Sequence, residues 1–272
     1  MPFTPSHVAA ALPFRRTRLI MSALVIGCIV PDTPFFLFLM AHGFHGHTLV
    51  GIFDFDLPMG LVELWLYHAF IRQPLLLFLP TGVRQRIGNG AGRFSFLPLS
   101  RFAWIVLSML VGIATHLLWD STCHMGTWPY RHWEFLRSRV HLPVIGVIAG
   151  YKLLEYLNSL FGIAVVAVWV WFWYRTTQPS ASRPVEPLNG TQKRVVAATL
   201  LTVAIVGGGI RAFLKVGVPA HLRPFVLFSA YALVTAIALL LVGLLVVGII
   251  LRRQSPARGG LAETNAPGWR EN

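Results

Sequence analysis

Several long apolar runs constrain this chain more than any other feature of its sequence. They reach the roughly 20 residues that an α-helix needs to cross the hydrocarbon core of a bilayer. Only 12% of the 272 residues are charged and 55% are hydrophobic, whereas soluble domains carry about 25% charged residues. We therefore expect an all-α fold, a polytopic integral membrane bundle of about six transmembrane helices.

The first of these runs carries an interruption. Pro31 and Asp32 fall inside it; proline kinks or ends a helix, and a carboxylate at membrane depth is costly unless it faces protein or a wet cavity. The N-terminal segment is therefore expected to be kinked, or to form a re-entrant hairpin with residues 15–18 at its tip. The six expected spans are 19–40, 57–79, 102–119, 157–174, 195–214 and 225–251.

Composition along the chain predicts four parts. Residues 1–175 form a transmembrane domain that is rich in His and Asp. Residues 176–194 have the Pro, Ser and Gly content of a linker. Residues 195–251 form an accessory transmembrane hairpin that lacks catalytic residue types, and the basic tail 252–272 is expected to be disordered. Any chemistry therefore belongs to the first part.

The net charge of +13 does not come from one basic cluster. Most of the 23 Lys and Arg residues lie in alternate connections between the apolar runs, which is the positive-inside pattern of membrane proteins. We therefore expect a multi-pass protein of the inner (plasma) membrane with a cytoplasmic C-terminus. Its partners are membrane lipids and a small or lipid-linked substrate, and nucleic acid is not among them.

The stretch GIATHLLWDSTCHMG, residues 112–126, closes the third run. His116, Asp120 and His124 follow one another at intervals of four, which places them on one face of a helix. Imidazole and carboxylate are good ligands for zinc, iron and manganese. A polar stripe that is hydrogen-bonded to neighbouring helices is the alternative, because HxxxD is a short pattern.

The expected topology brings other candidate ligands to the same outer side. Asp32 lies on the outward half of the first run, and the loop 41–56 is rich in His and Asp. His7 reaches this side only in the hairpin alternative. The candidates in the loop are His42, His45, His47, Asp54 and Asp56.

The motifs PFTPSHVAAALPF, GCIVPDTPFF, HTLVGIFDFDLPMGL, GIATHLLWDSTCHMGTW and YKLLEYLNSLFG resemble a bacterial membrane family catalogued as domain of unknown function 4184. The family is distantly similar to inner-membrane proteins named metal-dependent hydrolases. The resemblance covers roughly residues 1–175 and departs from the distant group after Asp32, where PDTP replaces PDxD, and at His47–Thr48, where that group has THS. As metal ligands it implies His7, Asp32, His47, His116 and Asp120, with His124 from the closer family alone.

These observations favour a membrane-embedded, metal-dependent hydrolase that uses a metal-activated water on a lipid or another membrane-associated ester. The expected cofactor is a divalent metal ion, Zn²⁺ before others, and Asp54 or Asp56 is the expected general base. Two alternatives stay open. Intramembrane His and Asp also mark the pathways of transporters and channels, and a closed four-ligand metal would only staple helices together.

Overall fold

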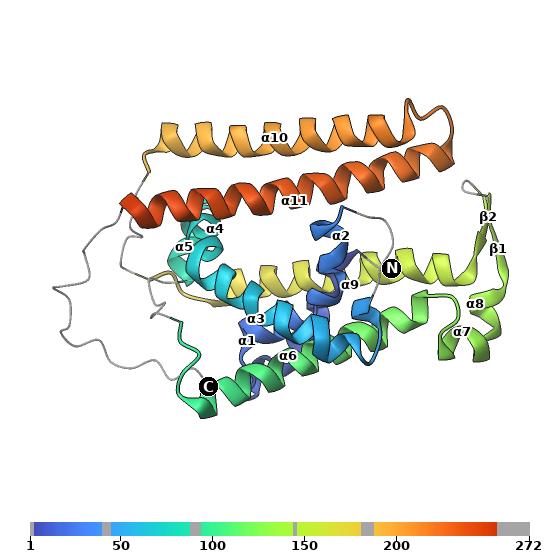
Figure 1. Ribbon diagram of the computed structural model, residues 1–272, viewed down its shortest axis with the longest axis horizontal. Helices are drawn as coiled ribbons and strands as arrows, with labels where there is room; N and C mark the ends of the chain where they lie inside the picture. Colours follow the sequence, from blue (N-terminus) through green and yellow to red (C-terminus); the bar gives the residue numbers. More distant parts are fainter. Residues whose placement is uncertain (1–2, 40–44, 88–93, 144–145, 181–187, 255–272) are drawn as a thin grey trace. The chain divides into compact units, whose positions relative to one another are not determined.

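The computed structural model describes residues 3–39, 45–87, 94–143, 146–180 and 188–254 (Figure 1). The chain divides into two compact units. The first unit contains residues 1–33, 44–64 and 95–177, and the second contains residues 34–43, 65–94 and 178–272. Parts of the predicted linker (181–187) and tail (255–272) lie outside the described residues.

The first unit is built on two long helices, α6 (Leu99–Asp120) and α9 (Gly150–Thr176). A 3-10 helix, Thr4–Arg16, and α1 (Met21–Gly27) pack against them, and α3 (Leu57–Leu66) begins in this unit. An antiparallel ribbon of β1 and β2, with Arg139 opposite Ala149, precedes α9. The short elements of the unit are the 3-10 helices Val30–Asp32, His45–His47 and Ser121–Cys123, the π-helix Ile52–Asp56, α7 (Trp128–His132), α8 (Glu134–Arg137), β1 (Arg139–Leu142) and β2 (Gly146–Ala149).

The second unit contains a hairpin of two long helices, α10 (Gly190–Val216) and α11 (Leu222–Gln254), which lie side by side in Figure 1. The partly buried side chain of Arg211 connects the two helices, because it donates a hydrogen bond to Thr235 Oγ1 at 3.3 Å and lies over the Tyr231 ring. The unit also holds most of α2 (Thr33–Leu37), the π-helix Tyr67–Ile71, α4 (Arg72–Phe78) and α5 (Thr81–Ile87).

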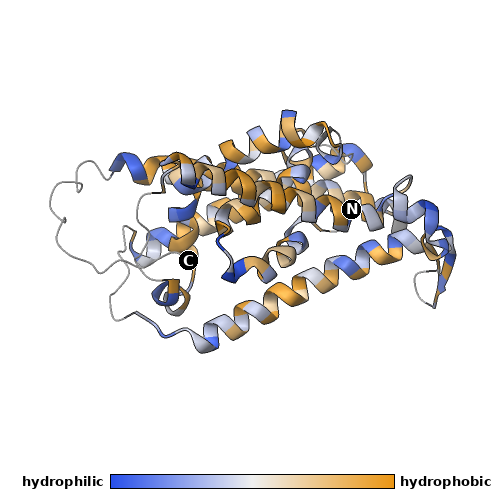
Figure 2. Ribbon diagram, turned by 90° about the horizontal axis from the view of Figure 1, so that it is seen from below, coloured by the Kyte–Doolittle hydropathy of each residue, from blue (hydrophilic) through white to orange (hydrophobic). Residues whose placement is uncertain are grey.

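The described residues include four helices that are long and apolar enough to cross a membrane, and a shorter apolar helical segment, Met21–Leu37. Figure 2 shows the apolar residues along these helices and polar residues at their ends. The polytopic all-α prediction is thus confirmed, with the kink at Pro31 that the sequence predicted. The four long helices are Leu99–His132, Gly150–Thr176, Gly190–Val216 and Pro224–Gln254.

The first expected span, 19–40, is broken into two short helices, α1 and α2, by the 3-10 turn Val30–Asp32. The second expected span, 57–79, is helical from Leu57 to Phe78, with a π-helical segment at Tyr67–Ile71.

The N-terminal segment forms a helical hairpin. The 3-10 helix Thr4–Arg16 and α1 pack together through Ala11, Leu24 and Cys28, and the turn between them lies beside Arg15 and Arg16. This is the shape of the hairpin alternative. A 3-10 helix repeats every three residues, so Thr4 and His7 lie on the same side of it.

Two glycines let α1 and α6 approach each other closely. A Cβ atom on Gly27 would overlap the carbonyl oxygen of Met109, and one on Gly112 would overlap that of Leu24. Small residues allow such contacts between membrane helices. The contact lies one helical turn before His116, so it sets the position of the metal-ligand candidates on α6.

Gly112→Ala is therefore expected to destabilise the fold by about 1–3 kcal/mol, the usual cost of overpacking a tight contact. Gly209→Ala is the matched control, because no described atom lies within 4 Å of the added Cβ and alanine favours helices by up to about 1 kcal/mol over glycine. Thermal unfolding of the detergent-solubilised protein measures both. Equal midpoints for the two variants would show that the α1–α6 contact is not tight.

Candidate metal centre

Six side chains from separate segments of the first unit converge at the C-terminal end of α6. The 3-10 helices contribute the candidates of the N-terminal half, and α6 with the turn after it contributes the others. The structure brings together all six residues that the motifs implicated, although the first and the last, residues 7 and 124, are 117 positions apart in sequence. They are His7, Asp32, His47, His116, Asp120 and His124.

The α6 helix presents His116 and Asp120 one turn apart, and both are buried with at most 1% of their surface exposed. The helix ends at Asp120, so the expectation of three ligands on one continuous helical face is wrong for His124. A 3-10 turn, Ser121–Cys123, follows the helix and brings His124 back. Its Nε2 atom lies 2.7 Å from Asp120 Oδ2.

The separations between potential ligand atoms match the edges of a metal coordination shell. His47 Nε2 lies 3.3 Å from Asp120 Oδ2 and 3.6 Å from Asp32 Oδ1. His116 Nε2 lies 3.5 Å from Asp32 Oδ1. With metal–ligand bonds of about 2.1 Å, neighbouring ligand atoms are about 3.0 Å apart in an octahedron and about 3.4 Å apart in a tetrahedron.

Two overlapping groups of three residues can each hold an ion, because one ligand atom from each residue lies within 4.8 Å of the other two. One contains His7, Asp32 and His116, and the other contains His47, His116 and Asp120. His116 belongs to both, and its ring stacks on that of His7 with 4.0 Å between the centroids. His116 is therefore the central member of the cluster.

The cluster contains buried nitrogen and oxygen atoms that have no hydrogen-bond partner, other than one another, within the described part of the chain. An orphaned buried polar atom costs about 1–3 kcal/mol, so a set of them requires compensation, and a cation held between them supplies it. The residues present thus fit a metal ion. The atoms are both ring nitrogens of His7 and His47, Nε2 of His116 and His124, Oδ1 of Asp32 and both carboxylate oxygens of Asp120.

Outer hydrogen bonds orient two of the candidate ligands. His116 Nδ1 lies 2.9 Å from the carbonyl oxygen of Cys28. A carbonyl only accepts, so Nδ1 carries the proton and Nε2 presents its lone pair to the cluster. Thr4 Oγ1 donates a 2.7 Å hydrogen bond to Asp32 Oδ2, which leaves Oδ1 facing His116 and His47.

Sequence reasoning missed these supporting groups. The three-residue spacing between Thr4 and His7 is a usable signal only once the segment is known to be a 3-10 helix. The carbonyl of Cys28 cannot be predicted from the sequence, because every residue has a backbone carbonyl. Asn158 on α9 is a third case, because its Nδ2 donates to Cys123 Sγ at 3.1 Å and holds the turn that precedes His124.

The two candidate bases differ in their surroundings. Both lie on the π-helical turn Ile52–Asp56, but Asp56 is fully buried whereas Asp54 is exposed. A Cβ atom on Gly46 would lie 2.6 Å from Asp56 Oδ1, which places this carboxylate against the residue before His47. The structure therefore brings Asp56, and not Asp54, beside the cluster.

The charges around His47 favour its protonated form in the absence of metal. Burial works against the charged imidazole, but the surrounding carboxylates, that of Asp120 foremost, outweigh it and raise the pKa of His47. The nearby carboxylates are thus strongly complementary to a cation. Of the other candidates in the loop, His42 and the side chain of His45 lie outside the described residues.

Comparison with known proteins identifies the family of this chain but no individual relative. Neither the curated proteins nor the solved structures contain a match to this chain. The family model described as domain of unknown function DUF4184 matches residues 1–249. That match includes the whole His/Asp cluster and both long helices of the C-terminal hairpin except the last turn. The chain therefore belongs to the DUF4184 family.

Proposed function

We propose that this protein is a membrane-embedded, metal-dependent hydrolase. The observation that carries the proposal is the convergence of six buried or half-buried His and Asp side chains with unsatisfied ligand atoms. Three or four of them suffice for a zinc site. The resemblance of the sequence motifs to proteins named metal-dependent hydrolases favours the same reaction class, although no curated protein matches this chain.

The side chains divide naturally into ligands and a base. His116 and Asp120 are the core ligands, completed by some of His7, Asp32, His47 and His124. A divalent ion held there, with Zn²⁺ expected, would lower the pKa of a water molecule to about 7 and so supply a nucleophile at neutral pH. Asp56 would then accept a proton from that water, because it is the buried carboxylate next to His47. Asp54 is its exposed neighbour and is left outside the reaction.

The position of the cluster suggests the substrate class. It lies at the C-terminal end of α6, a candidate membrane span, so it is placed near one surface of the bilayer. Ester groups of phospholipids and of lipid-linked compounds lie at that level. We therefore propose a lipid or another membrane-associated ester as the substrate.

A hydrolysis assay with metal removal and restoration tests this function. The purified protein is incubated with a panel of phosphodiester and carboxylic ester lipids, and product release is followed by mass spectrometry. Activity that disappears with a chelator and returns with Zn²⁺ is the expected result. Metal-dependent flux of protons or ions across proteoliposomes, with no hydrolysis of any ester, would instead favour the transporter alternative.

The affinity for metal is expected to fall at a higher pH than the pKa of an ordinary histidine would predict. A ligand imidazole must be neutral, and the pKa of His47 is raised above 6.5. Protons therefore compete at this residue already near neutral pH, and affinity falls as the pH drops through the raised pKa. Zinc titrations between pH 5.5 and 8.5 measure this. His47→Ala should flatten the upper part of the curve, whereas a curve that His47→Ala leaves unchanged would exclude His47 as a ligand.

For location, we propose the inner membrane with the C-terminus in the cytoplasm. The α6 helix separates residues 80–98 from residues after Asp120, so a span there puts the two on opposite sides. Single cysteines are introduced at Asn89 and at Arg137 and treated with an impermeant thiol reagent. Cys28 and Cys123 are buried, so their background is small. Labelling of Arg137→Cys alone is expected, and labelling of Asn89→Cys alone would reverse the orientation.

A further inference from the structure

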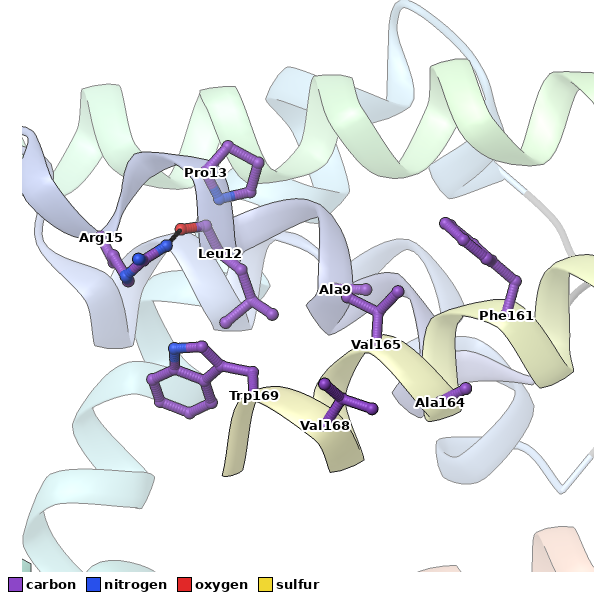
Figure 3. Close-up of a pocket in the computed structure, with 9 residues that line it drawn as sticks. All are labelled: Ala9, Leu12, Pro13, Arg15, Phe161, Ala164, Val165, Val168 and Trp169. Carbon is purple, nitrogen blue, oxygen red and sulfur yellow. Dashed lines mark hydrogen bonds between the residues drawn. The ribbon is translucent and has the colours of Figure 1, made fainter. Parts of the chain in front are cut away.

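A groove runs along the surface of the first unit between the N-terminal 3-10 helix and α9. Its volume is about 520 Å³, within the range of about 300–1,000 Å³ that is typical of ligand pockets. Figure 3 shows that the walls are mostly aliphatic, with Ala9 and Leu12 on one side and Val165 and Val168 on the other. Phe161 lies at one end. The groove therefore has the apolar lining that suits a hydrocarbon chain.

The other end of the groove is polar. Figure 3 shows the guanidinium group of Arg15 and the indole nitrogen of Trp169 at this end, on opposite walls. The Arg15 side chain is exposed, and one of its nitrogens, Nη1, donates to the carbonyl oxygen of Leu12 at 3.3 Å. A guanidinium has five N–H donors, so most of them remain for a ligand. Arg16 and Arg18 add positive charge to the same turn.

We expect the groove to open toward lipid. One wall belongs to α9, a candidate membrane span of which little is buried inside the protein. The C-terminal end of α9 has the sequence WVWFWYR, in which Arg175 lies over the Trp171 ring. Such aromatic residues mark the level of the lipid headgroups. Trp169 is the first residue of this aromatic stretch, and Arg15 lies at the same end of the groove.

We propose that this groove binds an anionic phospholipid of the adjacent leaflet. The phosphate accepts hydrogen bonds from Arg15, whose planar fork suits phosphate oxygens, and from the indole N–H of Trp169. One acyl chain lies between Leu12 and Val168 and ends at Phe161. Charge complementarity selects the ligand, because the polar end carries the guanidinium group of Arg15.

The groove is distinct from the metal centre but connected to it through packing. Phe161 at its apolar end contacts Trp119 with 6.3 Å between the ring centroids, and Trp119 contacts the ring of His7 at 5.6 Å. The lipid proposal does not depend on the hydrolase proposal. Lipid binding and metal binding are measured separately, and either can fail while the other holds.

Native mass spectrometry of the detergent-solubilised protein tests the lipid site. Dioleoyl phosphatidylglycerol is titrated against dioleoyl phosphatidylcholine, which has the same phosphate and chains but no net charge. We expect the first molecule of phosphatidylglycerol to bind about fivefold more tightly, given about 1 kcal/mol for each arginine near an anionic headgroup. Arg15→Gln should remove this preference, whereas Arg16→Gln, which removes the same charge from the same turn without lining the groove, should keep it.

Val168→Trp gives a second test because it fills the apolar part of the groove and leaves Arg15 in place. It is expected to lose the tightly bound phosphatidylglycerol while remaining monodisperse in gel filtration. Equal affinity for the two lipids in the wild-type protein would overturn the proposal. So would equal effects of Arg15→Gln and Arg16→Gln, since these would show that the basic turn attracts lipid without a defined site.

Discussion

Replacing His116 or Asp120 by alanine is expected to release most of the bound metal. His116 belongs to both groups of converging ligand atoms, and Asp120 lies within 3.3 Å of two imidazoles. Loss of a group that merely orients a ligand typically costs 10- to 100-fold in metal affinity, so loss of a central ligand should cost at least about 100-fold. Elemental analysis of the variants after gel filtration measures the metal that remains.

His132→Ala is the matched control for these variants. His132 lies on α7, shortly after the cluster, but its side chain is exposed and its Nδ1 atom lies 2.9 Å from the carbonyl oxygen of Trp128. It should keep the full metal content of the wild-type protein. If the three variants all retained equal metal, the ion would have to be bound elsewhere and the ligand assignment would be wrong.

Asp56→Asn is expected to abolish most hydrolysis while leaving the metal in place. The amide has nearly the same shape as the carboxylate but cannot accept the proton of the attacking water. General base catalysis contributes about 10²- to 10⁴-fold to a rate, so the turnover number should fall by that factor. Elemental analysis should still find the wild-type metal content, because Asp56 is placed next to the ligands and is not among them.

Asp54→Asn is the control two positions away on the same π-helical turn. Its side chain is exposed, so the substitution should leave the rate nearly unchanged. A loss of metal in Asp56→Asn would make Asp56 a ligand and remove it from the role of base. A larger loss of rate in Asp54→Asn than in Asp56→Asn would show that Asp54, and not Asp56, is the general base.

Local spacing in the sequence was enough to predict that His116 and Asp120 lie together. His116 and Asp120 are one turn apart on a single helix, and any helix would present them together. The helical spacing predicted the position of His124 only approximately, since α6 ends at Asp120 and a 3-10 turn brings His124 back beside it. His7, Asp32 and His47 come from distant segments. The expected topology put Asp32 and the loop of His47 on the same outer side, and the resemblance to a family added all three to the ligand candidates.

What the sequence left open depends on tertiary packing. Asp54 and Asp56 are equivalent as sequence, and only the fold buries one of them against Gly46. The 3-10 helix of residues 4–16 puts Thr4 on the side of His7, and it packs closely against α9 where Ser6 meets Gly162. The polytopic character followed from composition, but the broken first span shows that apolar length alone does not define a spanning helix.

The metal content of the wild-type protein tests the account most directly. Protein purified without chelator from cells grown with trace metals is separated by gel filtration, and the folded fraction is analysed for zinc, iron and manganese. The converging and otherwise unsatisfied ligand atoms predict one equivalent or more of a divalent metal for each chain. A protein that is stably folded and contains no metal, and that binds none when Zn²⁺ is added, would contradict the proposed metal centre and the hydrolase that rests on it.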